Sequence, residues 1–138
     1  MNVEITKNPN VENDDFIINN TRKYNSEFLE NDVKKLSVYI RNNQGEITAG
    51  LTAKTYWGIL HIEYLWVSET LRNKKIGSKL LLSAEIEAIK RGCVKSTLDT
   101  FSFQAVGFYK KHGYCVIGNL SGYTNDQTRH YLEKKLTK

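Results

Sequence analysis

One short stretch of the chain combines basic side chains, a glycine and the predicted start of a helix. Residues 72–78 read Arg-Asn-Lys-Lys-Ile-Gly-Ser, and they follow a strand-like segment that ends at Val67. The start of a helix presents backbone N–H groups without partners and the positive end of the helix dipole. This stretch, which we call the basic corner, can therefore bind a phosphate group. An ordinary strand-to-helix turn with solvated Lys and Arg side chains explains the same residues.

A carboxylate interrupts the apolar pattern of the strand-like segment 59–67. Strict alternation predicts one face of this strand to carry Leu60, Ile62, Tyr64 and Trp66. Glu63 then shares the opposite face with His61 and Leu65. A partly buried carboxylate at this place can accept a proton, directly or through water. The alternative for Glu63 is a surface or cross-strand ion pair.

The other residues of metal-ligand type do not form a metal-site pattern. His61, His112 and His130 lack the spacing of a metal site, and Cys93 and Cys115 have no histidine pairing close by. We therefore predict no metal, and we expect both thiols to be buried and reduced. His61 either packs in the interior or belongs to a substrate pocket. Aromatic residues that could line such a pocket, or could only pack, are Tyr56, Trp57 and Trp66.

Strands and helices in a regular order must position these residues. Alternation predicts strands over residues 2–7, 36–41, 47–56, 59–67, 94–101, 114–117 and 128–136. Helical spacing predicts helices over 11–29 and 75–91, and a shorter helix that Ser102 caps and Gly113 ends. The loop 118–127 either covers a substrate or is a mobile connection. An antiparallel meander followed by strand-helix-strand-helix-strand predicts a mixed α/β (α+β) sheet covered by helices on both faces.

Length and composition indicate one globular domain over residues 1–138. The chain is 40% apolar and 11% aromatic, which excludes a disordered chain. It has no apolar run of about 20 residues that could span a membrane, and its start lacks the pattern of a secretory signal. We therefore expect a cytoplasmic protein. The net charge of +5 admits an anionic partner, such as a nucleic acid or a phosphorylated cofactor.

Together, the basic corner and residues 100–114 resemble the GNAT superfamily of N-acetyltransferases. In that family a signature Q/R-x-x-G-x-G/A precedes a helix, and a later motif reads A-x-x-F-Y-x-x-x-G-F/Y, which matches Ala105 to Tyr114. The resemblance covers about residues 34–136. It implies a GNAT-like acyl-CoA N-acyltransferase fold and acetyl-CoA as the co-substrate.

The resemblance also implies a binding mode for acetyl-CoA. The backbone of Leu65, Trp66 and Val67 would pair with the pantetheine arm. The N–H groups of the basic corner would hold the diphosphate, and its residues are Arg72, Asn73, Lys74, Lys75, Ile76, Gly77 and Ser78.

This sequence departs from the family pattern at three cofactor-binding positions. Lys75 stands at the first signature glycine, and Asn73 replaces another common glycine. Where the backbone needs a positive φ, a non-glycine residue costs about 1–2 kcal/mol, which an ammonium group near phosphate would partly offset. Ser102 stands where many members have an asparagine that contacts the cofactor arm.

Two residues receive catalytic roles. Tyr109 matches the family's tyrosine that faces the CoA sulfur, and a phenol of pKa about 10 is protonated at neutral pH. Hydrogen bonding to the leaving thiolate fits Tyr109 better than full proton transfer, because a thiol is the stronger acid. Glu63 is the candidate base that takes the proton of the attacking amine. The alternative for Tyr109 is packing beside Phe108.

The resulting prediction is an N-acetyltransferase that moves an acetyl group directly to a primary amine. No cysteine occupies the position of an acyl carrier, which favours a ternary complex. The acceptor is a small molecule, a peptide or a protein amine. A CoA-binding module without catalysis is the alternative, and nucleic-acid binding through the basic surface is the least favoured. No membrane partner is expected, and a homodimer stays open.

Overall fold

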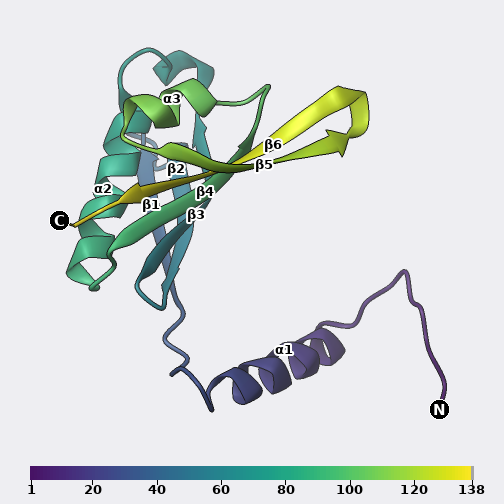
Figure 1. Ribbon diagram of the computed structural model, residues 1–138. Helices are drawn as coiled ribbons and strands as arrows, with labels where there is room; N and C mark the ends of the chain where they lie inside the picture. Colours follow the sequence, from purple (N-terminus) through teal and green to yellow (C-terminus); the bar gives the residue numbers. More distant parts are fainter. Residues whose placement is uncertain (138) are drawn as a thin grey trace. The chain divides into compact units, whose positions relative to one another are not determined.

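One mixed sheet contains the six strands of the computed structural model, which describes residues 1–137 (Figure 1). The strands are β1 (Lys34–Arg41), β2 (Ile47–Tyr56), β3 (Ile59–Val67), β4 (Lys95–Phe101), β5 (Cys115–Tyr123) and β6 (Gln127–Lys135). Their order across the sheet is β1-β2-β3-β4-β6-β5, and β3 pairs with β4 in parallel while the other pairs are antiparallel. The mixed α+β fold class is confirmed.

Two helices connect the strands that follow the meander. α2 (Ile76–Lys90) leads from β3 to β4, because parallel neighbours need a crossover connection. α3 (Val106–Lys111) leads from β4 to β5. The predicted helix 75–91 is confirmed to within one residue at each end. The predicted cap is wrong, because Ala105 precedes α3 and the Ser102 side chain bonds elsewhere.

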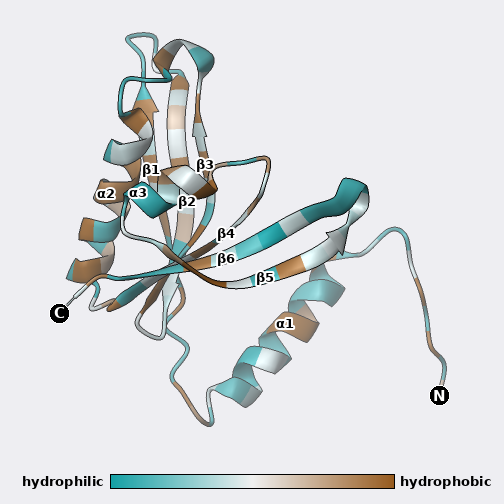
Figure 2. Cartoon of the chain, turned by 45° about the horizontal axis from the view of Figure 1, so that its top comes forward, coloured by the Kyte–Doolittle hydropathy of each residue, from teal (hydrophilic) through white to brown (hydrophobic). Residues whose placement is uncertain are grey.

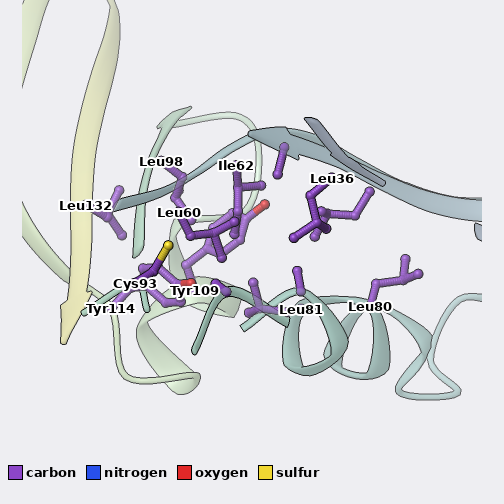
Figure 3. Close-up of a cluster of buried hydrophobic side chains, with 14 of the residues drawn as sticks. Leu36, Leu60, Ile62, Leu80, Leu81, Cys93, Leu98, Tyr109, Tyr114 and Leu132 are labelled. Carbon is purple, nitrogen blue, oxygen red and sulfur yellow. The ribbon is translucent and has the colours of Figure 1, made fainter. Parts of the chain in front are cut away.

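The core lies between the sheet and the apolar side of α2. Hydrophobic and hydrophilic segments alternate along α2 in Figure 2, as expected for a helix with one buried face. Leu80, Leu81 and Ala84 from this face are at most 1% exposed. Figure 3 shows Leu80 and Leu81 on α2 in the same cluster of buried side chains as Leu60 of β3 and Leu132 of β6, so α2 is fixed against the sheet by apolar packing.

The first 32 residues form a unit of their own, Met1–Asp32. It contains α1 (Val11–Asn25), whose first turn is capped by the Asn10 side chain accepting from the Asn13 N–H at 3.2 Å. No residue of α1 is buried. Residues 2–7 form no strand, so that prediction is wrong: two apolar side chains, Val3 and Ile5, alternate but stay exposed. Within residues 1–137, no helix is both long and apolar enough to cross a membrane.

A β-bulge in β3 overturns the predicted face assignment. Thr52 pairs with Tyr64 but Ala53 pairs with Ile62, so Glu63 is an extra residue in β3. An extra residue reverses the alternation beyond it. Leu65 and Val67 therefore join Leu60 and Ile62 on the core side, whereas Tyr64 and Trp66 are exposed. Glu63 therefore does not lie on the same face of β3 as Leu65, contrary to the prediction.

Two further predictions near the C-terminus are wrong. Residues 118–123, predicted as a loop, continue β5, and only Thr124–Asp126 turns the chain, as the 3-10 helix η2. Gly118 and Asn119 look like turn residues in sequence, but pairing with β6 holds them extended. Cys115, predicted to be buried, is exposed on β5, the strand at the edge of the sheet. Cys93 is buried, as predicted.

Candidate active site

Two non-glycine residues of the basic corner adopt a strained backbone with positive φ. These are the positions where members of the GNAT superfamily commonly have glycine. Between β3 and α2 the chain forms the short 3-10 helix η1 (Glu69–Leu71), and Arg72 Nε then donates to the Val67 carbonyl at 3.3 Å. Asn73 and Lys75 both have left-handed backbone, with φ of 64° and 60°. Lys75 directly precedes α2, and no side chain caps that end of the helix. The corner therefore combines open backbone amides, positive charge and two unfavourable conformations.

A close contact between α2 and α3 fixes the corner against the second helix. A Cβ atom on Gly77 would lie 3.2 Å from Cζ of Phe108, so only glycine allows this approach without movement. Ser78 Oγ lies 2.9 Å from His112 Nε2, one residue beyond the end of α3. The His112 ring also packs on Phe108, with ring centres 4.7 Å apart. The first turn of α2 thus has a defined position relative to α3.

The edge of β3 that faces β4 is paired along only part of its length. The parallel pairing runs from Ile59 opposite Lys95 to His61 opposite Thr97, and no later pair joins these two strands in the described chain. On its other edge β3 stays paired with β2 as far as Val67. The backbone of Leu65–Val67 therefore lies in a strand whose β4 side is open to an extended ligand.

Tyr109 lies on α3 and points into the interior. Only 8% of its surface is exposed, and its ring packs edge-on against Phe108 and Tyr114, with centres 5.1 and 5.8 Å away. Figure 3 shows it among the side chains between the sheet and α2. Burial raises the pKa of the Tyr109 phenol above its ordinary value. The group stays protonated at neutral pH and can act as a hydrogen-bond donor.

A polar cluster next to Tyr109 has three buried members, Glu85, Ser96 and Tyr114, and one half-buried member, Lys134. Tyr114 Oη lies 2.8 Å from Glu85 Oε2 and 2.7 Å from Ser96 Oγ, and Lys134 Nζ donates to Glu85 Oε1 at 2.8 Å. Glu85 is only 5% exposed. We call these four residues the buried cluster. They join α2, β4, β6 and the start of β5, so they hold the ring that packs on Tyr109.

Glu63 lines a cavity of about 380 Å³ on the sheet. The lining residues are His61, Ile62, Glu63, Tyr64, Asp99, Phe101, Gln104 and Arg129. The bulge turns the Glu63 side chain away from the core and leaves it exposed. His61 also reaches this cavity, and its Nδ1 lies 3.0 Å from Thr97 Oγ1. This opening, which we call the acceptor cavity, is the size of a small-molecule site.

An ion pair that the sequence did not reveal forms part of the acceptor cavity. Arg129 of β6 donates to Asp99 Oδ1 of β4 through Nε and through an Nη atom, each at 2.8 Å. Its guanidinium lies over the rings of Phe101 and Tyr131. The hydrogen bonds that Arg129 makes to Tyr123 and Asp99 raise the pKa of its guanidinium. The pairing of β4 with β6 places Asp99 opposite Tyr131, two residues from Arg129. Because this contact comes from strand pairing, no spacing in the sequence could have identified the ion pair.

The remaining predicted residues occupy several environments. Trp66, Arg72 and Lys74 are exposed, whereas Ile76 begins α2 and packs against the core. Trp57 is exposed at the turn between β2 and β3, and Tyr56 packs against it. Neither of these two aromatic residues lines the acceptor cavity. Ser102 follows β4 and bonds to His130, with Oγ 2.8 Å from Nε2.

Comparison with known proteins gives a consistent set of similarities. Residues 7–114 match the model of the "Acetyltransferase (GNAT) family". An acetyltransferase of Agrobacterium fabrum is 38% identical over 108 residues, which cover 78% of this chain and 79% of that protein. Blasticidin-S acetyltransferase of Streptomyces morookaense is 36% identical over 101 residues, which cover 72% of this chain and 74% of that protein.

A solved structure is similar to almost the whole chain. The crystal structure of an acetyltransferase from Agrobacterium tumefaciens matches with a TM-score of 0.93 and 33% sequence identity. The match covers 98% of this chain and 99% of that one.

Proposed function

Because this chain belongs to the acetyltransferase (GNAT) family, we propose that it transfers an acetyl group from acetyl-CoA directly to a primary amine. One observation carries the proposal: the pairing of β3 with β4 ends at His61, which leaves the Leu65–Val67 backbone open beside the basic corner. An extended arm can pair with such a strand edge while its phosphates meet the start of a helix.

The basic corner holds the diphosphate of acetyl-CoA. Its backbone amides at the start of α2 donate to phosphate oxygens, and Lys75 adds an ammonium group. The left-handed Asn73 and Lys75 residues support this role, because strained backbone at an exposed turn is retained where a ligand uses the resulting geometry. Because Gly77 has no side chain, Phe108 of α3 packs directly against the start of α2. This contact fixes the backbone amides of the corner relative to α3.

The reaction proceeds by direct attack of the amine on the thioester. The amine nitrogen forms a bond to the carbonyl carbon, its proton passes to Glu63 directly or through water, and the C–S bond breaks. Backbone N–H groups near Leu65–Val67 donate to the carbonyl oxygen as negative charge develops on it. Tyr109 donates a hydrogen bond to the leaving thiolate. Its raised pKa supports this donor role and disfavours complete proton transfer.

The acceptor is a small cationic amine that enters the acceptor cavity. A volume of about 380 Å³ suits a small molecule. The Glu63 carboxylate can bind the ammonium group of the acceptor. The Asp99–Arg129 ion pair forms another polar part of the cavity lining. The relative from Streptomyces morookaense is named for acetylation of blasticidin-S, and this name supports a small-molecule acceptor here.

The test is an acetyl-transfer assay with acetyl-CoA and a panel of small primary amines and peptides. We expect acetylated product from a small amine. Glu63→Gln should lower kcat/KM at pH 7 by about tenfold or more, with partial recovery at higher pH, where the amine loses its proton unaided. Glu46→Gln, in the turn between β1 and β2, is the matched control. No transfer to any amine would overturn the proposed function, and an unchanged Glu63→Gln would only remove Glu63 as the base.

A further inference from the structure

Three polar side chains form a hydrogen-bonded chain where β4 ends. Ser102 Oγ lies 2.8 Å from His130 Nε2, and His130 Nδ1 lies 2.6 Å from Asn119 Oδ1. The three residues come from the loop after β4, from β6 and from β5. Asn119 and His130 are register partners in the β5–β6 pairing, so the sheet fixes the shorter of the two contacts. We call these residues the Ser–His–Asn chain.

The hydrogen bonds determine where the protons lie. The amide oxygen of Asn119 can only accept, so Nδ1 of His130 must carry a proton. In a neutral imidazole Nε2 then has a lone pair, which faces the Ser102 hydroxyl. Another acceptor near this hydroxyl is the Thr128 carbonyl, at the longer distance of 3.4 Å. The geometry is that of a serine whose proton is taken by a histidine that a third group orients.

The position of Ser102 also suits attack on an ester. Ser102 lies in the turn from β4 to α3, and the backbone amide after a nucleophile at a strand-to-helix turn is a common donor to the developing oxyanion. Here that amide belongs to Phe103. The Phe103 ring is 70% exposed and stacks on Phe101, with centres 5.5 Å apart. Ser102 and Asn119 are exposed, so ester and water can reach the hydroxyl.

We propose that Ser102 is a nucleophile that hydrolyses activated esters and thioesters, with His130 as its base and Asn119 as the residue that orients the imidazole. The exposed ring of Phe103 favours aryl or other apolar esters. This activity is separate from acetyl transfer to an amine and does not depend on it.

Both steps of the reaction balance with water as the second reactant. First, Ser102 Oγ bonds to the acyl carbon while its proton moves to His130 Nε2. The bond from that carbon to the leaving alcohol or thiol then breaks, and the leaving group takes the proton from Nε2. Second, water attacks the acyl-serine and gives one proton to Nε2. The ester bond breaks, Ser102 regains that proton, and the carboxylic acid departs.

The test uses the full chain and p-nitrophenyl acetate, without acetyl-CoA or amine. We expect p-nitrophenolate release to continue after the protein's amines have reacted, and peptide mass spectrometry to find an acetyl group on Ser102. Ser102→Ala should abolish the continued release, and His130→Gln should reduce it by about 100-fold. Ser121→Ala, an exposed serine in β5, should leave it unchanged.

Asn119 provides the sharpest test of the chain. Asn119→Leu should lower the rate by about tenfold, whereas Asn119→Asp should retain it, because a carboxylate also accepts from Nδ1. Continued release that Ser102→Ala does not change, or acetyl groups found only on lysines, would overturn the proposal. Because the assay contains no CoA, its failure leaves the proposed acetyl transfer intact, and a failure of acetyl-CoA binding leaves this result intact.

Discussion

The buried cluster and the basic corner place polar groups in opposite circumstances. In the buried cluster, Glu85, Tyr114 and Lys134 satisfy one another through hydrogen bonds of 2.8 Å. In the basic corner, Asn73 and Lys75 adopt left-handed backbone on an exposed surface, and no side chain caps α2. Satisfied polar groups in an interior stabilise a fold. Strain and open amides at a surface support the proposed diphosphate site, so we assign stability to the first region and propose binding for the second.

Among the variants that test this division between the two regions, Lys134→Met should have the largest effect on stability. Removing the ammonium group leaves the buried Glu85 carboxylate without its cation, which should lower the free energy of unfolding by about 3 kcal/mol. Urea denaturation measures this change. Lys135→Met, next along β6 and exposed, should stay within about 0.5 kcal/mol of the parent. Affinity for acetyl-CoA should not change, and a large loss of affinity would break the division between the two regions.

Tyr109→Phe should separate catalysis from packing. The ring and its contacts with Phe108 and Tyr114 remain, so the melting temperature should change little. Loss of the hydroxyl removes a hydrogen bond made to the departing thiolate, and kcat should fall by about 100-fold with little change in cofactor affinity. Tyr39→Phe, on the exposed side of β1, serves as the control. Equal turnover in Tyr109→Phe and the parent would assign Tyr109 to packing alone.

The smallest effect, and the one that sharpens the comparison most, comes from Lys75→Gly. Glycine adopts the left-handed backbone without penalty, so stability should rise by about 1 kcal/mol. The same change removes an ammonium group from the corner, so acetyl-CoA should bind about tenfold more weakly. Lys74→Gly should lower stability instead, because Lys74 is not among the residues with positive φ. A stabilised Lys75→Gly variant with full affinity would show that the lysine does not contact the cofactor.

Much of the fold could be predicted because local patterns and tertiary packing agree. The four-residue spacing of Ile76, Leu80 and Ala84 predicts the buried side of α2, and the structure confirms it. Strands β2 and β3 were predicted at their observed bounds. The bulge at Glu63 could not be predicted, because alternation assumes that every residue of β3 has one partner in β2.

Residues of the candidate site could be predicted only where they lie close together in the sequence. The corner and Tyr109 lie within short motifs, and the conditional expectation of positive φ at Lys75 is met. Asp99 and Arg129 meet through the β4–β6 pairing, and Ser102 meets His130 in the same way. Each of these contacts joins residues about 30 positions apart, and no local pattern in the sequence encodes such a pairing.

Isothermal titration of the protein with acetyl-CoA tests the central claim most directly. The account predicts one binding site per chain, with an affinity that falls as salt concentration rises, since phosphate groups meet the positive corner. The Lys75→Gly variant should bind more weakly in the same titration. A cofactor concentration of about 1 mM detects even weak sites. No binding heat at that concentration would contradict the account.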